Sequence, residues 1–323
     1  KGDLSHSYVA QVLQGAGAGA LAATLTVAGT KVSYFALGKT SLFSELGSRY
    51  LVVKDSYDGL SGMAVPVEAQ NAYGLEQEAW LQGGLSTSDA TWRVLGSSVS
   101  ITSMILGLKS TGVAGSSPAL AATPLNNDFY LNADQWDGFS RYRREKLIPM
   151  MEGTAASPNG AISISGDIHS SWVSKHGMTG DIYSFTCPSI SSGTFQSFIS
   201  DQADTLVGTL AAGKTPDEQA ALFAAKESLM GLMDNVVQQS SALQTDPEKI
   251  SNGEIEYNKM DVHGFAVAEV DSSGFVVKMH QMNPERKGAD MVKNSYYNRQ
   301  KTVLDAFYEE GFRVEDGALV RIA

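Results

Sequence analysis

The chain has almost no cysteine: Cys187 is the single one among 323 residues. One cysteine excludes an intrachain disulfide framework. This fits a reducing compartment, and it equally fits bacterial secreted proteins that lack disulfides, so cysteine usage leaves the compartment open. Cys187 precedes Pro188 and has no basic neighbour in sequence, so we expect a small buried hydrophobe and not a thiolate.

Positive charge is also scarce. The sequence has 24 Lys and Arg against 35 Asp and Glu, a formal net charge of -11 with a pI near 4.9. Without an overall basic field the chain does not attract the phosphates of DNA or RNA, which excludes nucleic acid as a general partner. A small phosphorylated substrate held through a metal ion stays compatible with this charge.

Charge is absent from residues 7–30, and such a run can mark a membrane span or a signal sequence. Its glycines, threonines and glutamines make it only weakly apolar, and no cluster of positive residues precedes it. We therefore expect residues 1–45 to be a small-residue-rich segment and expect no transmembrane span.

The full chain is 43% hydrophobic and 18% charged, which is typical of a globular protein, and its local patterns alternate between strand and helix as in α/β proteins. We find no internal repeat and no clean linker, which indicates one layered domain over 1–323. Local patterns predict a short strand within 48–59, a helix over 74–85, a helix entering a strand over 88–101, a loop over 115–124, a helix with a basic face over 140–151 and a buried strand over 161–165.

The clearest local signals lie in the second half of the chain. Thr215 as N-cap, Pro216 at the first helical position and Glu218 together predict a capping box and a long helix. Two alternating runs on either side of 271–274 predict a β-hairpin. Both patterns are local, so they fix element boundaries well.

The chemistry centres on Gly166-Asp167-Ile168-His169, directly after the predicted buried strand. The glycine allows a sharp turn, and Asp167 and His169, two residues apart, offer a carboxylate and an imidazole to a cation. Asp167 as a turn former and His169 as a satisfied polar residue is the structural alternative.

Other polar candidates have ordinary structural interpretations. We expect half-buried His263 and His280, a solvent-exposed His176 in a turn, and a terminal position for His6. The arginines Arg141, Arg143 and Arg144 are expected on a solvated helix face, with contact to a substrate phosphate as the alternative. Trp136 and Trp172 fit a pocket rim or the core equally well.

Several motifs occur together and in a fixed order. They are SRYLVVKDSYDG from Ser48, LEQEAWLQGGLSTSDATWRVLGSSVSI from Leu75, DQWDGFSRYRREKL from Asp134, SGDIHSSW from Ser165, CPSISSGT from Cys187 and HGFAVAEV from His263. In this order they resemble the PhoD-like alkaline phosphatases, a branch of the binuclear metallophosphoesterases. The resemblance runs from about Gly47 to the final hairpin.

The resemblance implies a four-layer α/β/β/α sandwich, of which this chain holds the C-terminal portion. It implies catalytic metal ligands at Asp167 and His169 and further metal contacts from Asp134 and Asp137. From their side-chain chemistry, Arg141 and Trp136 are the candidates for substrate contacts. The resemblance also implies two or more metal ions, iron with calcium, with zinc or manganese as alternatives, a phosphate ester as substrate, and a periplasmic or extracellular location.

The sequence also departs from the family pattern. Ahead of Glu76 it has no GDxxD, no GNHE-like turn and no Asp-Cys pair, and KDSYD near Asp55 lacks the family's Asp-x-Arg. Because Asp167 and His169 alone cannot hold two cations, we expect a second polypeptide to supply the N-terminal ligand-bearing half. The alternative is a non-catalytic structural or assembly protein that keeps the fold.

Overall fold

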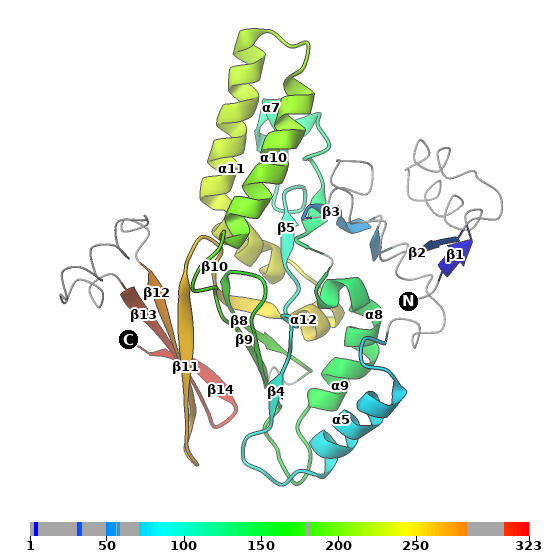
Figure 1. The fold of residues 1–323 in the computed structure, drawn as a ribbon, viewed down its shortest axis with the longest axis vertical. Helices are drawn as coiled ribbons and strands as arrows, with labels where there is room; N and C mark the ends of the chain where they lie inside the picture. The colour runs from blue at the N-terminus through cyan, green and yellow to red at the C-terminus, as the bar shows by residue number, and fades with distance from the viewer. Residues whose placement is uncertain are drawn as a thin grey trace.

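The computed structural model describes residues 3–5, 31–33, 50–55, 57–58, 71–132, 134–178, 181–282 and 307–322, which form a mixed α/β arrangement of several sheets and helices (Figure 1). Residues 7–30 and His6 lie outside the described residues. Among the described helices, none combines the length and apolar character that crossing a membrane requires.

A five-stranded sheet forms the centre, in the order β10-β8-β9-β7-β4. Its strands are β4 Val94–Gly96, β7 Ile162–Ser165, β8 Ser171–His176, β9 Ile182–Thr186 and β10 Glu254–Lys259. Strands β4, β7 and β9 are parallel, so their carboxyl ends lie along one edge of the sheet. The buried strand predicted over 161–165 is confirmed, because β7 lies in the middle of this parallel group and Ala161 before it is also buried.

A second, antiparallel sheet packs face to face on the central one. It consists of β11 Gly264–Val270, β12 Phe275–Met282, β13 Phe307–Glu315 and β14 Ala318–Ile322. Phe275 and Phe312 of this sheet share one buried cluster with Phe185 of the central sheet. The predicted hairpin is confirmed, since the Asp271 carboxylate accepts the N–H groups of Ser273 and Gly274 at 2.7 and 3.0 Å.

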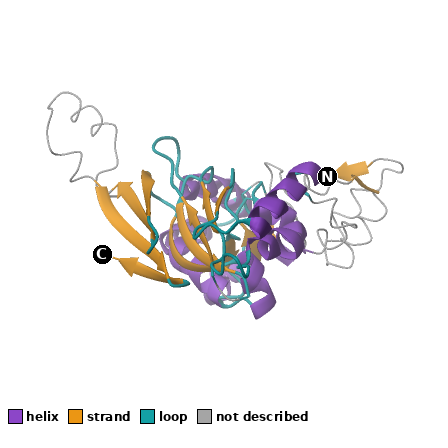
Figure 2. Cartoon of the chain, turned by 90° about the horizontal axis from the view of Figure 1, so that it is seen from below, coloured by secondary structure: helices purple, strands orange, loops and turns teal. Residues whose placement is uncertain are grey.

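Helices cover the opposite face of the central sheet. They include α5 Leu75–Thr87 and one continuous helical stretch, made of η2 Trp136–Phe139, α8 Ser140–Tyr142, η3 Arg143–Leu147 and α9 Ile148–Met151. Their apolar residues pack with Leu95 and Ile182 of the sheet. The described residues thus form three layers, sheet on sheet on helix, and in this part of the chain no helix covers the outer face of the second sheet (Figure 2).

A long helical hairpin, α10 Phe195–Ala211 and α11 Pro216–Ala242, projects beyond the sheets (Figure 1). The predicted capping box is confirmed at Thr215 and Glu218. The remaining elements are β1 Asp3–Ser5 and β2 Lys31–Ser33, which pair with each other; β3 Val52–Val53, β5 Ile105–Gly107 and β6 Asp128–Tyr130, which form a small sheet; and the short helices α6 Val113–Ser116, α7 Pro118–Ala121 and α12 Asp246–Asn252.

Two local predictions were wrong. Residues 88–93 form no helix, because tertiary contacts override the local pattern: Trp92 donates its indole N–H to the Asp271 carbonyl at 2.7 Å, and Arg93 donates to the Leu85 carbonyl at 2.9 Å. The loop predicted over 115–124 contains helical turns, since Pro118 occupies the first turn of α7, where its missing N–H costs nothing.

Candidate functional site

The Gly166–Ser170 loop follows the carboxyl end of β7, at the edge where the three parallel strands end. Burial alternates along it. Ile168 and Ser170 are buried, whereas Asp167 is exposed and His169 is half-buried. The buried pair anchors the loop and leaves the acidic and imidazole side chains accessible, at the place where open α/β sheets bind ligands.

The turn is made by the two functional candidates themselves. Asp167 has a φ of 74° and His169 a φ of 55°, whereas Gly166 is not among the glycines with positive φ. The expectation that Gly166 provides the sharp turn was therefore wrong. Left-handed φ at a non-glycine residue costs on the order of 1 kcal/mol, and such conformations cluster at functional sites.

His169 is held in one orientation. Its Nδ1 lies 2.7 Å from the Gly193 carbonyl, and its own carbonyl accepts the N–H of Phe195 at 3.1 Å, at the start of α10. The ring also packs on Phe198 at 5.5 Å between centroids. Because a carbonyl can only accept, Nδ1 carries the proton and Nε2 presents a lone pair. This is the arrangement in which histidine binds a metal ion.

Hydroxyl groups pack beneath this edge of the sheet. The hydroxyls of Ser165 and Thr186 lie 3.0 Å apart, and that of Thr186 donates to Ser100 at 2.8 Å. Cys187 follows β9, and its N–H donates to the Ser165 carbonyl at 2.9 Å. Burial raises the pKa of the Cys187 thiol, which keeps it protonated at neutral pH as the sequence predicts.

Asp137 lies in the interior. Its carboxylate accepts from Arg143 at 3.0 Å, from the Ser103 hydroxyl at 2.6 Å and from the Met104 N–H at 3.2 Å. Arg143 is also fully buried and donates to the Asn252 side chain at 2.6 Å, so the expected solvated position for Arg143 was wrong. Asp137 as a metal contact stays a prediction, and the contacts that the structure shows for it are structural.

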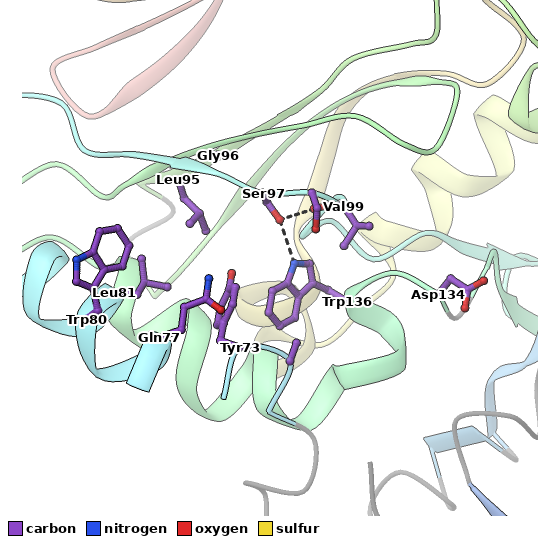
Figure 3. Close-up of a pocket in the computed structure, with 12 residues that line it drawn as sticks. Tyr73, Gln77, Trp80, Leu81, Leu95, Gly96, Ser97, Val99, Asp134 and Trp136 are labelled. Atoms are coloured by element: carbon purple, nitrogen blue, oxygen red, sulfur yellow. Dashed lines mark hydrogen bonds between the residues drawn. The ribbon is translucent and has the colours of Figure 1, made fainter. Parts of the chain in front are cut away.

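Three other candidates of the Asp134 motif lie along a pocket or at the helix surface. Asp134 and Trp136 line this pocket (Figure 3). Arg141 pairs with Glu145 at 2.8 Å on the helix surface, and Arg144 is exposed, in agreement with a solvated face. Substrate contact by Arg141 stays a prediction.

His176 is buried, not exposed. Its Nε2 is 2.9 Å from the Ser174 hydroxyl and its Nδ1 is 3.3 Å from the Ser251 carbonyl, so α12 covers the turn that the sequence placed in solvent. Burial, with the nearby charge of Arg143, lowers the pKa of His176 to about 3. Trp172 is fully buried in the core, while His263 and His280 are half-buried as expected.

The described residues fit part of a metal site. His169 presents a lone pair and Asp167 an exposed carboxylate on the same loop, which are ligand types for iron, zinc or manganese. Within the described ranges, however, no three or more His, Cys, Asp or Glu side chains come together as a metal-binding group. Two donors are fewer than the coordination shell of one such ion requires.

Sequence reasoning missed the pocket residues Tyr73, Trp80 and Ser97. A signal was present for Ser97, because it directly follows β4 just as Gly166 follows β7. Since parallel strands end at a common edge, the residues after each such strand are candidates together.

Comparison with known proteins gives three results. No curated protein matches the sequence significantly. A solved structure of PhoD matches at a TM-score of 0.40 and 16% sequence identity, covering 77% of this chain and 35% of that chain, so this chain spans about a third of that protein. The family model of the PhoD-like phosphatases matches residues 36–274, and the chain therefore belongs to the PhoD-like phosphatase family.

Proposed function

We propose that this chain carries Asp167 and His169 as ligands in the metal site of a phosphoester hydrolase. Family membership supports the reaction class. The observation that supports the site most directly is His169, whose Nδ1 bonds to the Gly193 carbonyl and leaves Nε2 free to bind a cation. Asp167 adds a negative charge on the same exposed loop, which favours cation binding.

When bound, metal ions in such a site supply an activated hydroxide and neutralise charge on the phosphoryl oxygens. Residues of this chain fix the positions of the two proposed ligands, Asp167 and His169. Ile168 and Ser170 fix the loop in the core, and the Gly193 carbonyl fixes the imidazole tautomer. Such fixed placement lowers the cost of orienting groups during the reaction.

The remaining ligands have to come from outside the described residues, because these offer no three-donor group. We propose that a second polypeptide provides them, so that the complete centre forms only in an assembly. The exposed position of Asp167 is compatible with such completion, since a buried carboxylate without partners would carry a high desolvation cost.

The test measures hydrolysis of p-nitrophenyl phosphate and bound metal in the natively purified assembly. We expect Asp167→Asn and His169→Gly each to lower activity at least about 100-fold and to lower bound metal, while the fold stays intact because Asn and Gly both tolerate positive φ. Asp316→Asn is the matched control, because Asp316 is also exposed and has a φ of 48°. Full activity in either ligand variant would refute the assignment.

A non-catalytic assembly role is the second candidate, and the lack of a three-donor group among the described residues favours it. Elemental analysis of the natively purified material separates the two functions. Near-stoichiometric iron, calcium, zinc or manganese supports the hydrolase. An intact assembly without bound metal supports the structural role.

A further inference from the structure

A pocket of about 510 Å³ opens between α5, the end of β4 and Trp136 (Figure 3). Its volume is within the range of cavities that bind small organic molecules. Figure 3 shows Trp80 and Asp134 at opposite ends, with Tyr73 and Trp136 between them. Aromatic side chains therefore form much of the length of the pocket.

The inner aromatic wall is fixed in place. The Trp136 indole N–H donates to the Ser97 hydroxyl at 3.3 Å, and Ser97 in turn donates to the Val99 carbonyl at 2.6 Å. The Trp136 ring lies 5.4 Å from Tyr73 and stacks on Tyr142 at 6.2 Å and 13°. Rings that are already oriented lose little entropy when a ligand binds.

The segment before α5 is equally well fixed. The Asn71 side-chain carbonyl accepts the N–H groups of Tyr73 and Gly74 at 2.8 and 3.0 Å, and its amide donates to Glu78. Glu78 also accepts the Tyr142 hydroxyl at 2.7 Å. The backbone of Tyr73 is thus held by Asn71, and its ring lines the pocket.

The outer end of the pocket carries an unusual exposed aromatic. Trp80 is 75% exposed on α5. Exposing the large apolar surface of a tryptophan to water is unfavourable in free energy, more so than for most side chains. Gln77 adds an uncharged hydrogen-bonding group, and Asp134 a negative one. Among the described lining residues there is no Lys or Arg, so the pocket suits an uncharged ring and disfavours a phosphate.

The register of the sheet connects the pocket to the candidate loop. Gly96 pairs with Ile164 in the parallel ladder, and the Ser97 N–H donates to the Ile164 carbonyl at 2.9 Å. Ile164 lies three residues before Asp167, and adjacent strands are about 4.8 Å apart. The pocket wall and the candidate ligand loop therefore begin on neighbouring strands at one edge.

From this geometry we propose that the pocket binds an uncharged ring, and that this ring belongs to the alcohol part of the phosphate ester. The second statement rests on the proposed function. The ring stacks between Trp80 and the fixed Tyr73 and Trp136 wall, while Gln77 on α5 forms a hydrogen bond to one of its hydroxyl groups. The phosphate then lies outside the pocket, toward the Asp167 loop.

The experiment measures binding of four compounds by ligand-observed NMR: methyl β-D-glucopyranoside, benzyl alcohol, acyclic glycerol and inorganic phosphate. We expect at least one of the two ring compounds to bind at least about tenfold more tightly than glycerol, and Trp80→Ala to weaken it about tenfold. Leu75→Ala is the matched control, because Leu75 is 71% exposed on the same helix and does not line the pocket. The two ring compounds distinguish a sugar from an aryl group.

Ring compounds that bind no better than glycerol would overturn the proposal, as would an equal loss in Trp80→Ala and Leu75→Ala, or displacement of the ring compound by phosphate. The binding measurement needs no catalysis. A natively purified assembly that binds the ring but hydrolyses no ester therefore keeps the pocket and refutes the proposed function. In an active assembly, Trp80→Ala should raise KM for a ring-bearing phosphate ester and leave KM for glycerol phosphate unchanged.

Discussion

Two aspartates from the two most distinctive motifs occupy opposite environments. Asp137 is buried and its carboxylate has three short contacts, to Arg143, Ser103 and Met104. Asp167 is exposed on a loop and adopts a φ of 74°. The contrast separates two environments of a carboxylate: one joins distant segments of the fold, and the other is left accessible on a loop at a backbone cost.

The histidines show the same contrast. Both ring nitrogens of His176 contact groups of the protein, Ser174 and Ser251, within the interior. His169 has one nitrogen bonded to Gly193 and stands beside the exposed aspartate. A titratable residue whose contacts are complete stabilises the fold, whereas one with a lone pair at an accessible edge can bind a ligand.

The largest expected loss of stability follows from breaking the buried ion pair between Arg143 and Asp137. Arg143→Ala leaves the Asp137 carboxylate buried without its cation, so we expect the free energy of unfolding to fall by about 3–5 kcal/mol. Arg144→Ala, on the exposed side of the same helical stretch, should change it by less than about 0.5 kcal/mol. Urea unfolding curves measure both. Equal losses in the two variants would show that the Asp137 interaction is not structural.

The next effect is a pH dependence from His176. Its folded-state pKa of about 3 lies below the unfolded value near 6.5, so the unfolded chain binds a proton that the folded chain does not. Stability is therefore full above pH 6.5 and falls as the pH drops toward 3. When the pH falls from 7 to 5, the extra proton on His176 of the unfolded chain should lower the free energy of unfolding by about 2 kcal/mol.

Urea unfolding of wild type and His176→Gln at both pH values tests this dependence. Glutamine offers a donor and an acceptor in a similar volume, so the variant should retain the fold and lose this contribution. The stability of wild type should fall by about 2 kcal/mol more than that of the variant between pH 7 and pH 5. The same decrease in both proteins would show that His176 is not protected from protonation.

Local signals predicted the elements that depend on neighbours in sequence. Thr215 and Glu218 are three residues apart and cap α11 as expected, and the 271–274 turn joins β11 to β12. Strand β7 was predicted because a short apolar run followed by a polar turn is typical of a buried strand. In each case the interactions that decide the structure are close in the chain.

Interactions between distant residues explain what could not be predicted. Arg143 binds Asn252, which is 109 positions later, and His176 contacts Ser251, which is 75 positions later. No local pattern marks either pair, so both residues were assigned to the surface. The pocket likewise joins Tyr73, Ser97 and Trp136 from three separate segments, although the strand before Ser97 gave a partial signal.

The smallest effect on stability is expected for Asp167→Gly, and it tests most directly whether Asp167 differs from Asp137 in not supporting the fold. Asp167→Gly removes a side chain from a backbone with φ of 74°, which relieves local strain but adds freedom to the unfolded chain. These contributions oppose each other, so the free energy of unfolding should stay within about 1 kcal/mol of wild type. Bound metal in the assembly should nevertheless fall, because the carboxylate is lost.

Asp316→Gly, at a φ of 48° in the β13–β14 turn, should have a similarly small effect on stability and none on metal content. If Asp167→Gly instead destabilises the protein as strongly as Arg143→Ala, then Asp167 supports the fold as Asp137 does, and its exposed position has no functional meaning.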